Sequence, residues 1–433
     1  MGASRLKRSL GQGLRAMLLM VMACACGGPG LMPVATPEPV TLRFAFREGM
    51  VDYTPLLTAF QEKNPLITVE VVEVDRFDGG SMESVVKDRD VDVFRDDRRA
   101  LEDAKAGLLT PMVDLQRDEW SSIRDDYYKG TWEALSLQGQ QWGVPAGLDM
   151  LVAFVNKDQL AALKLAEPPG DWALLDLLDL ASKMNYPEGL PYNESAKLFG
   201  CCTGPDGIDP VVFVYLHGGK IVDSLTNPTR ATLDDPLTVE AVKWYADLFT
   251  KYNVAPDPET VRTQFTRGGI YEAQVRGLCG VWLNQYSTRG GRDISYHWEF
   301  EFRMRPLPKD KATFEVADLD GYFITKRCEH PAEALRFVRF LAERWEAAGQ
   351  KLPPRRSLVQ SDAYLKAVGG DAAALAKSFS DRVTMLPYGN ENPALQKVGE
   401  VFLLTVQQII KEKLDPAKAL GGAQDQAAAL LGQ

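Results

Sequence analysis

Polar and aromatic side chains stand directly at the ends of three short apolar runs in this sequence, residues 41–46, 91–94 and 280–283. In open α/β sheets, ligands bind beyond the carboxyl ends of the strands. Aromatic faces pack on sugar rings and polar groups bond to sugar hydroxyls, so these residues predict a site for a polar organic solute. They are Arg47 and Glu48 after the first run, Arg95, Asp96 and Asp97 after the second, and Trp282, Asn284 and Tyr286 in or after the third.

Each of these residues also has a purely structural interpretation. The charged string from Asp96 to Arg99 would then pair internally on a solvated surface, where ion pairs contribute little. Trp282 fits a core strand as well as it fits a stacking platform. Asp149, the one carboxylate in the apolar stretch 142–157, would then be a surface residue that caps this strand.

Motifs for catalysis or metal binding do not occur. The three histidines, His217, His297 and His330, lie far apart without metal-binding spacing, and no HExxH, GxSxG or P-loop pattern is present. The sequence therefore predicts neither metal nor cofactor, and it does not predict an enzyme. A hydrolase with a pair of carboxylates, as in glycosidases, remains an alternative, although 59 acidic residues supply such pairs by chance.

The elements that position these residues alternate between strand and helix. Strands over 41–46, 67–74 and 91–94 enclose a helix over 52–63 and a second, shorter helix, which predicts an open α/β sheet with helices on its faces. The stretch 142–157 reads as a strongly apolar strand that crosses from one lobe to another. At 433 residues, with 45% hydrophobic and 25% charged content, the chain suits two globular domains or lobes.

The N-terminus has the pattern of an export signal. Four basic residues and no acidic residue accompany the apolar run 16–23, which is far shorter than the ~20 apolar residues that span a bilayer. The run ends in Val-Met-Ala before Cys24, which resembles the lipobox of bacterial lipoproteins. Residues 1–23 are therefore expected to be a lipoprotein signal peptide, with Cys24 lipidated and Cys26 as the runner-up; the alternative is an ordinary cleaved signal.

Residues 24–40 are rich in Gly and Pro and nearly uncharged, so we expect a tether that holds the folded part away from the membrane. Loss of residues 1–23 would leave 45 basic against 59 acidic residues, a net charge of −14. An acidic surface disfavours nucleic acid as a partner.

Four cysteines remain in the body of the chain, Cys201, Cys202, Cys279 and Cys328. An exported protein can form disulfides, and adjacent cysteines rarely bond to each other. Cys279 is the expected partner of one of the adjacent pair, but the sequence does not fix which one.

Several segments, taken in order, resemble one family, although each is weak alone. They are TLRFAF, DVF followed by AGLLTPM, QQWGVPAGLDMLVAFVNKDQL, DWALLDLLDLASKM, LCGVWLN, GYFITKRCEHPAEALRFVRFLAERW and LPPRRSL. Together they resemble the extracellular solute-binding proteins of ABC importers, in particular the sugar-binding branch that includes maltose-binding protein. The resemblance covers nearly the whole chain after the tether.

The resemblance implies a two-lobed periplasmic-binding-protein-like α/β fold of type II, with the ligand in a cleft between lobes. Lobe 1 would comprise 41–148 plus 315–350, and lobe 2 would comprise 152–312 plus 353–433. The implied mechanism is lobe closure, which a ligand favours only through contacts that bridge both lobes.

The resemblance also implies particular ligand contacts. Asp149 falls where the family places an acidic or polar contact at the first crossing, and Tyr388 falls where it places an aromatic residue. The loop after 91–94 would lie in the cleft, but the family often has an aromatic residue where Arg95 stands. That difference counts against a neutral sugar.

The expected function is therefore a lipid-anchored binding protein, monomeric and on the outer face of the cell membrane. It would deliver a ligand, most simply a sugar or oligosaccharide, to the permease of an ABC transporter. The second hypothesis is the same fold binding another solute, such as a peptide, polyamine or phosphoester.

Overall fold

The computed structural model describes residues 38–49, 51–75, 82–112, 118–185, 198–266, 268–291, 297–386 and 392–432. The expected signal peptide, the two candidate lipidation sites Cys24 and Cys26, and nearly all of the tether lie outside these ranges. Residues from Pro39 onward form one compact unit, and the description below concerns this unit.

The first strands and helices follow the predicted alternation. In chain order they are β1 Val40–Arg47, α1 Thr54–Lys63, β2 Ile67–Val74, α2 Glu83–Asp88, β3 Val93–Asp97, the 3-10 turn η1 Arg98–Ala100, α3 Leu101–Lys105, α4 Asp118–Arg124, η3 Glu133–Leu135, β4 Ser136–Leu137, β5 Gln140–Gln141 and β6 Gly143–Asn156.

The middle of the chain is mainly helical around three strands. Its elements are α5 Lys157–Leu163, α6 Leu174–Met184, β7 Phe199–Cys202, α7 Asp209–Leu216, α8 Pro236–Thr250, α9 Pro258–Gln264, α10 Ile270–Val275, β8 Cys279–Gln285, η4 Tyr286–Thr288 and β9 Phe302–Arg305.

One further strand precedes a helical C-terminal part. The elements are β10 Ala317–Ile324, α11 Pro331–Ala342, η6 Trp345–Ala348, α12 Arg356–Val359, α13 Asp362–Val368, α14 Gly370–Ser378, α15 Pro393–Glu412 and α16 Pro416–Leu430.

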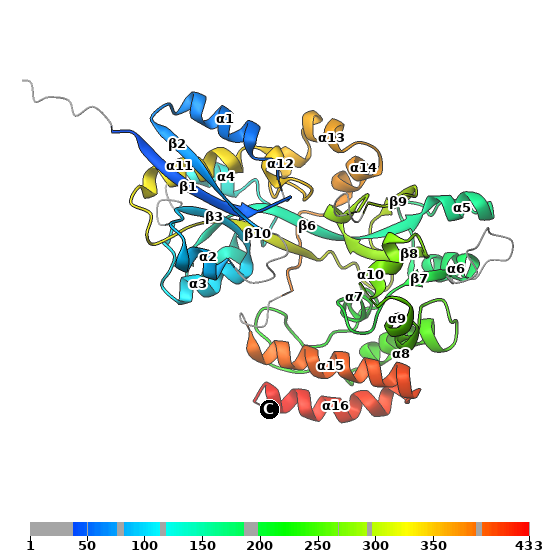
Figure 1. Cartoon of the computed structure of the whole chain (residues 1–433). Helices are drawn as coiled ribbons and strands as arrows, with labels where there is room; N and C mark the ends of the chain where they lie inside the picture. The colour runs from blue at the N-terminus through cyan, green and yellow to red at the C-terminus, as the bar shows by residue number, and fades with distance from the viewer. Residues whose placement is uncertain are drawn as a thin grey trace, which may run out of the picture. The chain divides into compact units, whose positions relative to one another are not determined.

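Strand β6 joins two groups of strands (Figure 1). Its first part pairs antiparallel with β10, which in turn pairs with β3 and thereby connects to β1 and β2. Its second part, from Leu151 onward, pairs antiparallel with β8 and β9, and β8 pairs with β7. All fourteen residues of β6 are buried, which explains why this strand reads as a nearly unbroken apolar run.

A second passage between the two strand groups lies beside β6. The Leu151 amide donates to the Val316 carbonyl just before β10, and Leu148 and Leu352 exchange backbone hydrogen bonds across an isolated bridge, each at 2.9 Å. The prediction that the chain first crosses between strand groups at 142–157 fits these pairings, and the mixed α/β class is confirmed.

A disulfide fixes β7 against β8. Cys202 and Cys279 are bonded, so Cys279 does pair with one of the two adjacent cysteines. Cys201 and Cys328 are free and buried. Next to the bond, Gly200 must be a glycine, since an added Cβ would lie 1.8 Å from the Ala181 carbonyl oxygen of α6.

The sequence pattern from Tyr127 to Ala134 predicts a helix, and this prediction is wrong. Tyr127 and Lys129 form isolated β-bridges with Arg355 and Arg382, and Gly130 has φ of +95°. Tertiary pairing with the distant segment 355–382 therefore overrides the local helical pattern.

Candidate ligand-binding site

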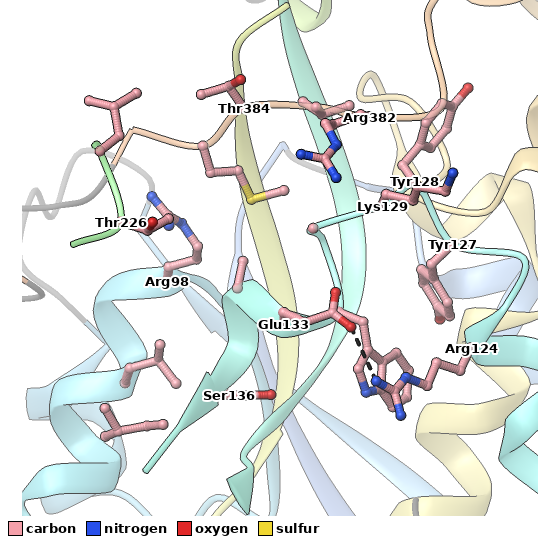
Figure 2. A pocket seen from close by; sticks show the side chains of 18 of the residues that line it. Arg98, Arg124, Tyr127, Tyr128, Lys129, Glu133, Ser136, Thr226, Arg382 and Thr384 are labelled. Carbon is pink, nitrogen blue, oxygen red and sulfur yellow. Dashed lines mark hydrogen bonds and ion pairs between the residues drawn. The ribbon is translucent and has the colours of Figure 1, made fainter. Parts of the chain in front are cut away.

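A cavity of about 940 Å³ lies among segments that are far apart in sequence (Figure 2). Its described lining comes from η1 and α3, from the region between α4 and β4, from the loop between α7 and α8, and from the segment before α15. We call it the central pocket. Its lining residues are Arg98, Leu101, Glu102, Lys105, Arg124, Asp125, Tyr127, Tyr128, Lys129, Gly130, Trp132, Glu133, Ala134, Ser136, Leu137, Leu225, Thr226, Arg382, Val383, Thr384, Met385 and Asn392.

The lining combines aromatic residues with hydroxyl groups. Tyr127, Tyr128 and Trp132 belong to it, but they are only 3%, 5% and 6% exposed, and their side chains pack into the core. Hydroxyls come from side chains such as Ser136 and Thr384. A volume of this size and this mixture of apolar and polar groups suit a small organic ligand.

Charged groups surround the same space. The Arg124 guanidinium contacts the Glu133 carboxylate at 3.2 Å, as the dashed line in Figure 2 marks, and Lys105 contacts Glu102 at 2.5 Å. Arg98 is buried and donates from Nη2 to the Leu386 carbonyl at 2.5 Å. The lining is therefore polar on several sides, with its acidic groups partly neutralised.

None of the nine predicted ligand residues that the structure describes lines the central pocket. The cluster after β3 is instead structural in this conformation. Arg95 is 1% exposed; its guanidinium contacts Asp320 at 2.9 Å and donates to the Ala347 carbonyl at 2.7 Å. Because Arg95 is buried, its guanidinium has no N–H group available to a ligand, so the structure favours the packing interpretation for this residue.

The two following carboxylates also have partners within the protein. Asp96 accepts from the Met82 amide at 3.2 Å, and burial raises the pKa of Asp96 to about 6. Asp97 accepts from the Arg99 amide at 2.8 Å and pairs with the Arg99 guanidinium at 2.7 Å. This pairing matches the structural alternative given for the charged string.

Asp149 is buried beside the crossing rather than exposed. Its carboxylate accepts from the Ser287 amide at 2.9 Å and hydroxyl at 2.6 Å, and it lies 3.9 Å from the Lys351 ammonium. Burial raises the pKa of Asp149, against the opposing effects of Lys351 and Ser287.

Asp320 completes this crossing cluster, which we define as Arg95, Asp149, Ser287, Asp320 and Lys351. The Lys351 ammonium lies 2.8 Å from Asp320. Burial by itself would raise the pKa of Asp320, but Lys351 and Arg95 hold it below its usual range. The cluster ties β3, β6 and β10 together where the chain passes between strand groups.

The three residues on and after β8 are largely internal. Trp282 is fully buried and stacks on Phe154 with ring centroids 5.5 Å apart, which favours the core interpretation over the stacking platform. The Tyr286 hydroxyl lies 3.1 Å from that of Tyr364, and the Asn284 amide donates to Gln274 at 2.9 Å.

Glu48 lines a second cavity of about 640 Å³ beside β1 and α1, together with Asp52 and Gln350. Arg47 lies 3.9 Å from Asp96. Tyr388 lies outside the described residues, although its sequence neighbours Met385 and Asn392 both line the central pocket.

Sequence reasoning missed most of the central pocket. From the sequence, packing is the simpler interpretation of the pair Tyr127–Tyr128, and both side chains do pack in the core, although both residues also belong to the lining. Residues 127–132 are rich in Tyr, Lys, Gly and Trp, which is unusual for a helix, and this composition could have indicated that the segment contributes to a binding site.

A family model for the bacterial extracellular solute-binding protein matches residues 47–344. The chain belongs to this family. This solute-binding protein is therefore of an exported class, and its family consists of binding proteins.

Solved structures share the fold at low identity. One is an ABC substrate-binding protein from Listeria monocytogenes in complex with cycloalternan (16% identity, TM-score 0.70, covering 91% of this chain and 100% of that chain). Another is the sugar-binding protein MalE from Xanthomonas citri (16% identity, TM-score 0.67, 90% and 97%). A third is UgpB from Mycobacterium tuberculosis in complex with glycerophosphocholine (17% identity, TM-score 0.65, 92% and 99%).

Two further observations concern the described residues only. No helix there is long and apolar enough to cross a bilayer. No group of three or more His, Cys, Asp or Glu side chains is placed there to hold a metal ion.

Proposed function

We propose that this solute-binding protein captures a sugar or oligosaccharide in the central pocket and delivers it to the permease of an ABC transporter. The proposal is supported by which segments of the chain supply the residues that line the pocket. Residues such as Leu101 precede the β6 crossing, whereas Thr226 and Thr384 follow it. A ligand that contacts both sets of segments would favour a closed state through bridging contacts.

The lobes of the proposal are those expected from the sequence, 41–148 plus 315–350 and 152–312 plus 353–433. Closure would take place about β6 and the segments that run beside it, because these connect the two groups of strands. The predicted contacts at the ends of β1 and β3 and at Asp149 would then become ligand contacts only after rearrangement.

The ligand class draws support from the hydroxyl-bearing and apolar residues of the lining and from what similar proteins bind. The Listeria monocytogenes protein is in complex with cycloalternan, and the Xanthomonas citri protein is a sugar-binding protein. The Mycobacterium tuberculosis protein is in complex with glycerophosphocholine, which supports a phosphoester as the alternative solute.

A hydrolase would need two free carboxylates facing each other across the pocket. Glu102 and Glu133 are held in ion pairs with Lys105 and Arg124, which disfavours this reaction. The excess of basic residues around the pocket also disfavours a polyamine.

Membrane attachment through a lipid on Cys24 is part of the proposal. Metabolic labelling with an alkyne fatty acid should label the wild-type chain, and Cys24→Ser should abolish labelling. If Cys24→Ser is still labelled and Cys26→Ser is not, the lipidated residue is Cys26.

The binding proposal is tested by thermal unfolding with a broad panel of mono- and oligosaccharides. A ligand at about 100 times its Kd stabilises the native state by about 2.7 kcal/mol, which gives a clear rise in Tm. Thr226→Trp should reduce that rise because Thr226 is an exposed residue of the lining, and an indole there obstructs part of the pocket.

Thr58→Trp is the matched control, since Thr58 is exposed on α1 and does not line the pocket. It should respond to ligand like the wild type. A panel that leaves Tm unchanged, or stabilisation that Thr226→Trp does not reduce, would count against the proposal.

A further inference from the structure

We infer that the saccharide bound in the central pocket carries an anionic group, a carboxylate or a phosphate. This inference rests on the proposed function and narrows its substrate class. The observation behind it is a juxtaposition of basic side chains, chiefly Lys129 and Arg382, within a hydroxyl-bearing pocket of an acidic protein.

The charge of the lining is opposite to that of the chain. The whole chain has 49 basic and 59 acidic residues. The described lining of the central pocket has five basic residues, Arg98, Lys105, Arg124, Lys129 and Arg382, against three acidic ones, Glu102, Asp125 and Glu133. A cleft of one charge sign focuses its field and attracts ligands of the other sign.

Two of the acidic residues are already neutralised within the lining, Glu102 by Lys105 and Glu133 by Arg124. Arg98 is buried, is bonded to the Leu386 carbonyl, and also interacts with the Asp318 carboxylate. These cations therefore contribute less to binding, which leaves Lys129 and Arg382 as the two basic side chains available to a ligand.

Lys129 and Arg382 are paired residues of a parallel β-bridge between segments more than 250 positions apart. The Lys129 amide donates to the Asp381 carbonyl at 2.8 Å. Both side chains are exposed and line the central pocket, where Figure 2 labels them. Within the described ranges, neither the ammonium nor the guanidinium has a carboxylate partner at ion-pair distance.

Two carboxylates near this bridge are engaged elsewhere, and Asp125 is the one acidic residue of the described lining for which no ion pair is seen. Asp381 pairs with Arg356 at 3.0 Å, and Glu315 accepts hydrogen bonds from Ser380. Like charges on facing positions of neighbouring strands destabilise their pairing. A bound anion removes this repulsion and gains charge-assisted hydrogen bonds from both cations, with a guanidinium suited to two-point contact with carboxylate or phosphate.

The other residues that line the pocket favour an organic ligand over an inorganic anion alone. The hydroxyls of Ser136 and Thr384 and the partly exposed apolar side chains of Leu225 and Met385 suit a sugar ring attached to the charged group.

Calorimetric titration of the full chain with matched ligand series tests the inference. The probes are galactose, galacturonate and galactose 6-phosphate, the corresponding glucose series, α-1,4-galactobiose against digalacturonate, and inorganic phosphate alone. We expect an acidic member to bind at least about tenfold more tightly than its neutral counterpart, because a hydrogen bond to a charged group contributes about that much. Comparison of the carboxylated and phosphorylated members distinguishes the two sources of charge.

The double variant Lys129→Gln/Arg382→Gln should lose at least about tenfold in affinity for the acidic probe, and added salt should weaken the wild type in the same direction. Arg336→Gln removes an exposed arginine outside the pocket and serves as the matched control, which should leave affinity unchanged. Tm without ligand shows whether each variant is folded.

Neutral members that bind as tightly as acidic ones would overturn the anionic ligand while leaving the proposed function intact. If inorganic phosphate binds as tightly as the sugar phosphate, the inference that the anionic ligand is a saccharide is overturned. Failure of every neutral and acidic saccharide to bind would contradict the proposed function itself.

Discussion

Asp149 shows how burial changes the expected role of a single residue. The sequence predicts either a ligand contact at the crossing or a surface residue at this position, and removal of an exposed side chain costs little stability. The structure places its carboxylate against both donors of Ser287 and near Lys351. Removal of one partner from such a group leaves buried donors unpaired, which is more costly than the loss of the bond itself.

We therefore expect Asp149→Ala to lower the free energy of unfolding by about 2–3 kcal/mol. Chemical denaturation of the unliganded protein measures this. Asp149→Asn keeps an acceptor for Ser287 and should lose less. Stability within about 0.5 kcal/mol of wild type for Asp149→Ala would show that the site is open to solvent.

Asp209 is predicted to make stability depend on pH. Burial at the start of α7 raises its pKa to about 7, although the Thr203 hydroxyl donates to it at 2.6 Å. The folded state then holds the proton more tightly than the unfolded state, so stability is fully present below the unfolded pKa and is lost as pH rises.

The free energy of unfolding should accordingly fall between about pH 4 and pH 7, by up to about 4 kcal/mol from this group. Asp209→Asn keeps an acceptor for Thr203 and cannot titrate, so the difference between the two proteins isolates Asp209. Parallel pH profiles for wild type and Asp209→Asn would refute the assignment.

At the scale of single residues, the polar side chains at strand ends could be predicted from the sequence, but the residues with which they interact could not. Asp97 pairs with Arg99 two positions away, and that possibility was visible locally. Arg95 pairs with Asp320, which is 225 positions away, and no local pattern indicates such a contact.

At the scale of elements, the disulfide connects β7 with β8 and closes a loop of 77 positions. By the chain-entropy argument such a crosslink stabilises the fold by about 2–4 kcal/mol. Chemical denaturation with and without reductant should show this difference in the wild type.

A Cys202→Ala/Cys279→Ala variant should be as unstable as the reduced wild type and insensitive to reductant. Cys201→Ser/Cys328→Ser is the control, because both thiols are free and buried, and it should keep the reductant effect. A wild type whose stability does not respond to reductant would contradict the pairing.

Element types could be predicted wherever periodicity was strong. The apolar run of β6 and the helices α6 and α8 follow their patterns closely. The region 127–134 could not be predicted, because its bridges are made with residues more than 220 positions later.

At the scale of the whole molecule, family membership and the α/β class followed from the order of the segments. The central pocket did not, because its walls come from residues 98–137, 225–226 and 382–392, which only the folded chain brings together. The central claim concerns these walls: one ligand contacts segments from before and after the β6 crossing.

Hydrogen–deuterium exchange of the full chain, with and without the saccharide that raises Tm most, tests this claim most directly. Amides within 98–105 and 124–137 and those within 225–226 and 382–385 should become protected together, because a bridging ligand stabilises both sets of segments. Protection confined to one set, or no protection in either, would contradict the account.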